Sequence, residues 1–187
     1  MSRVITPYSK IMSNESLMVL FRKAFDNLKA IAPAHNPFAG HLSGDEATKS
    51  RFGFANAGIG TISDLVSQAE LVRVEEGTEA ILFVFDANWK YGIGEVVTNR
   101  PVDVNSYTME RIHGMLQPKG DGEITRTKTN RFTICLTWED IPGQGRDLAL
   151  ASVYPGSPDA PWDMTDLTEG QIISGKELLE RGCTRVC

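Results

Sequence analysis

The stretch Ala80-Ile81-Leu82-Phe83-Val84-Phe85 is a continuous apolar run rich in β-branched and aromatic residues. A short apolar run of this kind predicts a buried central strand. In residues 131–138 apolar side chains instead alternate with more polar ones, which predicts a half-buried antiparallel strand. The apolar members of that second stretch are Phe132, Ile134, Leu136 and Trp138. Together the two stretches indicate an antiparallel sheet with a buried central strand.

Three further stretches have the composition of strands, namely residues 91–98, 123–128 and 147–154. After the turn residues Asp86-Ala87-Asn88, we expect residues 91–98 to pair with the 80–85 strand as a hairpin. The dipeptide Thr129-Asn130 predicts a second hairpin, in which residues 123–128 pair with the 131–138 strand. Residues 106–116 are ambiguous between helix and loop.

Helical periodicity occurs before the strands. From Ser13 to Ile31 apolar residues recur at the i, i+3, i+4, i+7 spacing, and Ser13 or Asn14 can cap the helix. Thr61-Ile62-Ser63-Asp64 has the form of a capping box and predicts a second helix that reaches Val72. A short helix is also predicted at residues 174–179. Because helices come first and strands mostly later, the order favours an α+β fold.

The chain length of 187 residues suits one domain. We expect a helical arm at residues 1–33, which Pro33 ends, and a long loop rich in Gly, Asn, Ala and Ser at 34–60. Residues 61–187 would supply a helix, an antiparallel sheet and a short C-terminal helix. The expected architecture is therefore a single α+β domain in which N-terminal helices pack on a twisted antiparallel sheet.

Charge and cysteine content narrow the cellular context. The chain has 19 Lys and Arg against 24 Asp and Glu, a net charge of −5, so a nucleic-acid site has to be local. An odd count of three cysteines favours a reducing compartment, although Cys183 and Cys187 could pair or bind a metal. Without a signal sequence or an apolar span we expect a cytoplasmic protein that does not enter a membrane.

Several common catalytic motifs are absent. The sequence has no P-loop, no G-x-S-x-G elbow and no H-E-x-x-H, and Gly92-Ile93-Gly94 lacks the third glycine of a dinucleotide fingerprint. His35, His41 and His113 are not spaced as metal ligands on one helix. We therefore expect no metal site and no cofactor.

A different set of residues could carry metal-free chemistry. Ser152 and Tyr154 are two apart on a predicted strand, so both side chains project from one face. If the long loop folds over that face, His41 supplies an imidazole and Arg51 a permanent cation. Metal-free cleavage of RNA needs a base, a proton donor and groups that stabilise charge on the phosphate. Four basic side chains are candidates for RNA phosphate contacts, namely Lys49, Arg126, Lys128 and Arg131.

These motifs also carry a resemblance. Gly40-His41, Lys49-Ser50-Arg51, residues 61–70 and the Ser152-Val153-Tyr154-Pro155-Gly156 strand resemble the RNase A-like C-terminal toxin domains of bacterial contact-dependent inhibition proteins. The resemblance spans residues 40–156 in patches, and Ser152 stands where those domains have Thr. It implies that His41 is the base or acid, that Arg51 binds phosphate, and that Ser152 and Tyr154 donate from their hydroxyls. It also implies RNA as substrate and a cognate inhibitor protein as a partner.

A second interpretation belongs to another class. An acidic α+β chain can be a non-enzymatic interaction protein, an inhibitor or immunity-type partner that presents carboxylates to a basic surface. Its contact groups would be Glu75-Glu76, Asp121, Glu123, Glu139-Asp140 and the acidic residues between 163 and 166. In that case His41 is an ordinary loop histidine and Tyr154 packs at the end of a strand.

Overall fold

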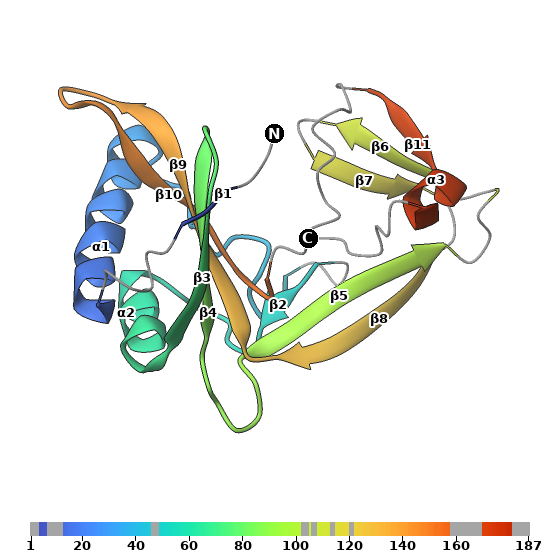
Figure 1. Cartoon of the computed structure of the whole chain (residues 1–187), viewed down its shortest axis with the longest axis horizontal. Coiled ribbons are helices and arrows are strands. Elements are labelled where there is room, and N and C mark those ends of the chain that lie inside the picture. The colour runs from blue at the N-terminus through green and yellow to red at the C-terminus, as the bar shows by residue number, and fades with distance from the viewer. Residues whose placement is uncertain are drawn as a thin grey trace.

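A computed structural model describes residues 4–6, 13–45, 49–101, 105, 108–112, 115–119, 122–157 and 170–180. Two helices, α1 (Asn14–Ile31) and α2 (Ile59–Gln68), lie on one side of a five-stranded antiparallel sheet (Figure 1). The strand order is β1 (Val4–Thr6), β3 (Glu70–Glu76), β4 (Ala80–Asp86), β9 (Arg131–Ile141) and β10 (Gly145–Pro155). The predicted α+β fold, with an N-terminal helix packed on an antiparallel sheet, is confirmed.

Two smaller sheets accompany this layer. One joins β2 (Arg51–Phe52), β5 (Gly94–Pro101) and β8 (Gly122–Thr129). The other joins β11 (Ile172–Ser174), β6 (Thr108–Ile112) and β7 (Met115–Lys119), with α3 (Gly175–Glu180) directly after β11. In Figure 1 the long pair β5 and β8 extends away from the helices, so the chain leaves the main sheet and returns to it.

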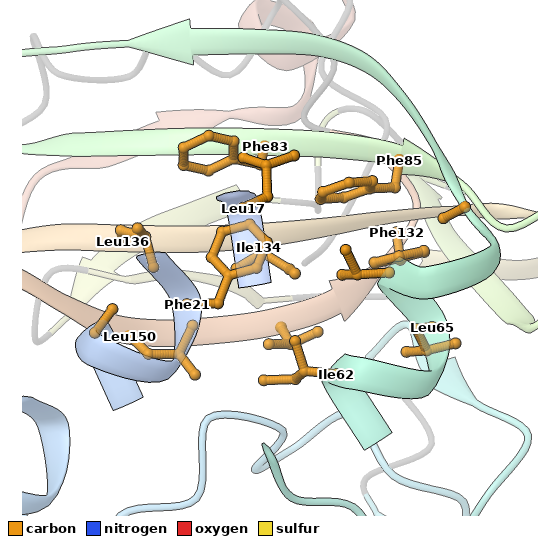
Figure 2. Close-up of a cluster of buried hydrophobic side chains, with 14 of the residues drawn as sticks. Leu17, Phe21, Ile62, Leu65, Phe83, Phe85, Phe132, Ile134, Leu136 and Leu150 are labelled. Carbon is orange, nitrogen blue, oxygen red and sulfur yellow. The ribbon is translucent and has the colours of Figure 1, made fainter. Parts of the chain in front are cut away.

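The buried core lies between the helices and the sheet (Figure 2). Phe21 of α1 sits edge-on to Phe83 and Phe85 of β4, with ring centroids 5.2 and 6.1 Å apart. Phe85 in turn stacks on Phe132 of β9 at 5.1 Å. These rings are fully buried, and aromatic pairs in edge-on and offset geometry add to the burial energy. The two apolar stretches at 80–85 and 131–138 are therefore neighbouring strands of one sheet.

Helix α1 is held at its start and along its length. The Ser13 hydroxyl accepts the backbone N–H of Ser16 at 3.2 Å, as expected for an N-cap. The Asn14 amide donates to the carbonyls of Val66 and Ala69, which joins α1 to the end of α2. Further along, the buried Asn27 amide donates to the Leu148 carbonyl of β10 at 2.8 Å. The helix is thus anchored to the sheet by polar as well as apolar contacts.

The two predicted hairpins are wrong. β4 pairs with β3 and β9, whereas the stretch predicted as its hairpin partner forms β5 and pairs with β2 and β8. Residue 130 separates β8 from β9, yet the two strands belong to different sheets. The physical reason is the difference in polarity: β9 has an apolar face to bury against the helices, whereas the end of β8 carries Arg126 and Lys128.

The second helix is also shifted. It begins at Ile59 after Gly58, and the Thr61 hydroxyl accepts the Gly58 backbone N–H at 3.1 Å, so Thr61 lies inside the first turn. It ends at Gln68, and Val72 lies in β3 with 39% of its surface exposed. The ambiguous residues 106–116 contain β6 and the start of β7. Strand β3 carries four charged residues, and this is why apolar periodicity did not predict it.

Candidate active site between the long loop and strand β10

The long loop after α1 lies along the edge of β10. The Val153 backbone N–H donates to the Pro37 carbonyl at 2.8 Å, and His35 Nε2 is 3.1 Å from the Ala151 carbonyl oxygen. Between Leu150 and Ser152 the register of β10 against β9 shifts by one residue, so Ala151 is a bulge. The loop therefore covers the edge of the sheet at the point where its ladder is irregular.

Ser152 and Tyr154 share the face of β10 that points away from the helices. Ser152 pairs with Cys135 and Tyr154 pairs with Thr133, while Val153 between them pairs with Ile134 and is buried in the core. Directly paired residues in an antiparallel sheet lie on the same face. Both side chains are half-buried.

His41 lies against Tyr154. The centroids of the two rings are 5.7 Å apart and the ring planes are inclined by 39°. His41 Nδ1 is 2.7 Å from the Ser50 carbonyl oxygen, which can only accept a hydrogen bond. Nδ1 therefore carries a proton, and in the neutral ring the lone pair is on Nε2. This tautomer is the one that can take up a proton at Nε2.

The backbone around His41 is fixed by pairing within the loop. The Phe52 N–H donates to the His41 carbonyl at 2.7 Å, and the Ser43 N–H donates to the Phe54 carbonyl at 2.8 Å. Gly40 adopts φ +83°, and Lys49 lies across it, since a Cβ on Gly40 would be 3.3 Å from Lys49 Nζ. The structure thus brings Lys49 next to the Gly40-His41 dipeptide.

Arg51 follows directly after the carbonyl that holds His41, but it lines a neighbouring hollow of about 690 Å³. We call this the Trp89 hollow. Its other lining residues are Ser43, Phe52, Gly53, Phe54, Trp89, Tyr91, Gly92, Ile93, Gly94, Glu95 and Lys128. In the sheet register Arg51 pairs with Glu95 and Glu95 pairs with Lys128, so these three residues lie on one face.

The other predicted phosphate contacts are divided between two places. Lys128 lines the Trp89 hollow, and Arg126 Nη1 is 3.5 Å from Glu95 Oε2. Arg131 instead lies 3.5 Å from Asp86 and lines a separate hollow near Ser13 and Asn14. The basic patch is divided because the chain passes from one sheet to another at residue 130.

Sequence reasoning missed the aromatic part of this region. Trp89 is 40% exposed and Tyr91 is 75% exposed, in the loop that joins β4 to β5. A usable signal was present in the sequence, since two aromatic residues flank Lys90 in a segment of turn residues.

An ion pair on the sheet face that carries Tyr154 was missed as well. Arg73 Nε is 3.4 Å from Glu75 Oε1, and the Glu75 side chain is only 12% exposed. The register aligns Glu75 with Leu82, Cys135 and Ser152, and Arg73 with Val84, Thr133 and Tyr154. Three strand spacings, about 14 Å, separate the two ends of each row. The pair therefore lies on the same face as Tyr154, three strand spacings away along the sheet.

Comparison with protein families, with curated proteins and with solved structures finds no match. Within the part of the chain that the structure describes, no three His, Cys, Asp or Glu side chains gather as metal ligands. Over the same residues, no helix combines the length and apolar character needed to span a membrane. Cys183, Cys187, His113 and the acidic residues at 121 and 163–166 lie outside the described residues.

Proposed function

We propose that this chain is a metal-independent, toxin-like ribonuclease that cleaves RNA through its own 2′-hydroxyl. The observation that carries the proposal is the approach of His41 to Tyr154, with ring centroids 5.7 Å apart. A group that can accept a proton and a group that can donate one are the two requirements of this reaction. Here they come from segments more than a hundred residues apart in the sequence.

The chemistry follows from these two groups. His41 Nε2 takes the proton of the ribose 2′-hydroxyl, and the 2′-oxygen attacks the adjacent phosphorus. The bond from phosphorus to the 5′-oxygen breaks, and the leaving oxygen takes a proton from the Tyr154 hydroxyl. The proton on His41 then returns through solvent to the Tyr154 oxygen. The products are a 2′,3′-cyclic phosphate and a free 5′-hydroxyl, without a metal ion and without consumption of water.

Charge on the phosphate oxygens also needs stabilisation. Lys49 lies across Gly40, one residue from His41, and Arg51 follows the carbonyl that orients the imidazole. Lys49 lies in the same loop as the proposed base and Arg51 begins β2 directly after that loop, so a phosphate at His41 would have cationic residues close by. Ser152, on the same face as Tyr154, is a further hydroxyl donor. No cofactor is needed in this scheme.

The test is incubation of the purified protein with total RNA in EDTA, followed by end-group analysis of the fragments. We expect fragments with 2′,3′-cyclic phosphate ends, and we expect His41→Ala to lower the cleavage rate at least about 100-fold. The unfolding free energy of this variant should fall by about 1–3 kcal/mol, because the carbonyl of the buried Ser50 loses its hydrogen bond from His41, so urea unfolding is measured alongside to show that the variant is folded.

The matched control is His35→Ala. His35 lies in the same loop and also contacts a backbone carbonyl, but it is bonded to Ala151 at the edge of β10. We expect this variant to retain cleavage. Equal activity of His41→Ala and the wild type would refute the mechanism, as would cleavage of RNA whose 2′-oxygens are all methylated.

If the wild-type protein does not cleave RNA, the interaction-protein interpretation becomes the working one. Of its proposed contact groups, Glu75 is mostly buried beside Arg73, while Glu139 and Asp140 are exposed where β9 turns into β10. A ribonuclease of toxin type would itself require a cognate inhibitor protein as a partner. A partner search is therefore the next step under either interpretation.

A further inference from the structure

We propose that the Trp89 hollow binds one unstacked base of single-stranded RNA, with Tyr91 and Trp89 as the stacking surface. This inference rests on the proposed ribonuclease function and specifies the form of its substrate. The hollow is lined by Arg51 and adjoins the 41–54 segment that carries His41. A strand whose scissile phosphate is at His41 would therefore place a neighbouring nucleotide over the hollow.

The loop that joins β4 to β5 and carries Trp89 and Tyr91 is held in a fixed conformation, and this argues for a recognition role. The Asn130 side chain donates to the Trp89 carbonyl at 2.8 Å and accepts the Trp89 N–H at 3.2 Å. The Ala87 and Ile93 N–H groups donate to the Asn130 and Thr129 carbonyls at 2.8 and 2.9 Å. The loop therefore presents exposed rings on a backbone that is tied on both sides.

Two residues of this loop have backbone conformations that L side chains rarely adopt. Asn88 has φ +59° and Gly92 has φ +77°. At Gly92 a Cβ would lie 2.9 Å from the Thr129 carbonyl oxygen, so only glycine fits without displacement. Such specific geometry directs Tyr91 outward, where 75% of its surface is exposed to solvent. A ring exposed to this extent contributes little apolar burial to folding.

The charges around the rings suit a nucleotide. Arg51 and Lys128 lie on the same face as Glu95, on either side of it. Lys90 Nζ is 5.2 Å from the centre of the Tyr91 ring. Arg51 and Lys128 can contact phosphates. Glu95 lies 3.5 Å from Arg126 through Oε2, and its other carboxylate oxygen can accept a hydrogen bond from the amino group of a base. This local arrangement exists although the chain as a whole carries a net charge of −5.

Stacking on a protein ring requires a base whose faces are accessible. In a duplex both faces of each base are covered by its neighbours, whereas a single strand can turn one base out. The volume of about 690 Å³ is within the range of small-ligand sites, and the hollow is bounded on one side by exposed rings. The geometry therefore favours single-stranded RNA over a duplex.

The experiment measures binding without cleavage. A fluorescein-labelled 2′-O-methyl oligoribonucleotide cannot be cleaved at its 2′-oxygen, so fluorescence anisotropy gives its Kd directly. We expect Tyr91→Ala to weaken binding about 5- to 150-fold, the range for loss of one base–aromatic stack. Tyr91→Phe keeps the ring and should bind within about twofold of the wild type. The same oligonucleotide in a duplex should bind more weakly than the single strand.

The outcomes separate this inference from the proposed function. Wild-type affinity in Tyr91→Ala, equal affinity for duplex and single strand, or no binding at all would overturn the base-binding hollow. If Tyr91→Ala binds with wild-type affinity, or if duplex and single strand bind equally, loss of cleavage in His41→Ala would still support the ribonuclease. Conversely, binding that depends on Tyr91 in a protein that does not cleave RNA would refute the catalytic proposal and keep the RNA site.

Discussion

At the scale of single residues, Asp147 gives a pH-dependent contribution to stability. Its carboxylate accepts the Leu148 N–H at 2.8 Å and lies 3.1 Å from both Asn27 Nδ2 and Lys23 Nζ. The backbone hydrogen bond from Leu148, with smaller effects of Lys23 and Asn27, holds the pKa of Asp147 below its ordinary value of 3.8. Because the pKa is lower in the folded state, the ionised carboxylate stabilises the fold at any pH above the unfolded-state pKa. This stabilisation is lost as the pH falls through the folded-state pKa.

We therefore expect Asp147→Ala to lower the free energy of unfolding by about 1–2 kcal/mol at pH 7. The difference from the wild type should shrink as the pH falls below about 4, because the unfolded chain then takes up a proton at Asp147 that the folded wild type takes up only at lower pH. Urea unfolding at pH 7 and at pH 3 measures both values. Asp140→Ala, at an exposed carboxylate on β9, is the control and should change stability by less than about 0.5 kcal/mol.

At the scale of secondary-structure elements, substitution by Ala should have opposite effects on stability at two glycines, Gly94 and Gly60. Gly94 of β5 faces Phe52 of β2, and a Cβ there would be 2.5 Å from the Arg51 carbonyl oxygen. Gly60 lies in α2 and a Cβ there would meet nothing within 4 Å. We expect Gly94→Ala to destabilise by about 1–3 kcal/mol and Gly60→Ala to stabilise by about 0.5–1 kcal/mol.

Thermal and urea unfolding of the two variants measure these effects. Gly94→Ala should also weaken binding of the oligonucleotide, because it moves β2 and with it Arg51. Gly60→Ala should leave binding unchanged, since α2 does not line the Trp89 hollow. A stable, tightly binding Gly94→Ala variant would show that the close approach of β2 to β5 is not required.

Sequence patterns predicted individual elements better than their partners. α1 and β9 follow from apolar periodicity, β4 from a continuous apolar run and β10 from a strand-like composition, because each buries apolar side chains in the core around Phe21, Phe83 and Leu150. Strand pairing depends on contacts between segments that are distant in the sequence. The single residue between β8 and β9, residue 130, is compatible both with a hairpin and with a passage from one sheet to another. Strand β3 was missed because charged residues occupy most of its positions.

At the scale of the whole molecule, the sequence predicted the part of the candidate site that depends on one strand but not the parts that depend on distant segments. The i, i+2 spacing of Ser152 and Tyr154 predicted their common face, because this property is local to one strand. The approach of His41 depends on how the loop lies along β10, which is set by the hydrogen bond that the Val153 backbone N–H donates to the Pro37 carbonyl. The Trp89 hollow depends on the junction of two sheets, and no local pattern predicts such a junction.

Because the chain carries a net charge of −5, affinity for RNA has to come from local cations. The dependence of this affinity on salt therefore separates the two function classes. If two phosphates contact Arg51 and Lys128, the slope of log affinity against log salt for a single strand should be about −1.4, so Kd should rise about 7-fold from 50 to 200 mM salt. Lys128→Gln, at an exposed position on β8, removes one contact and should reduce this rise to about 2.6-fold. Anisotropy titrations with the 2′-O-methyl oligonucleotide measure both slopes.

Neutralising Glu139 and Asp140 should leave these slopes unchanged, because both residues are on β9 and outside the hollow. An interaction protein that presents its acidic groups to a basic partner would show the reverse, with affinity for that partner dependent on Glu139 and Asp140 and independent of Lys128.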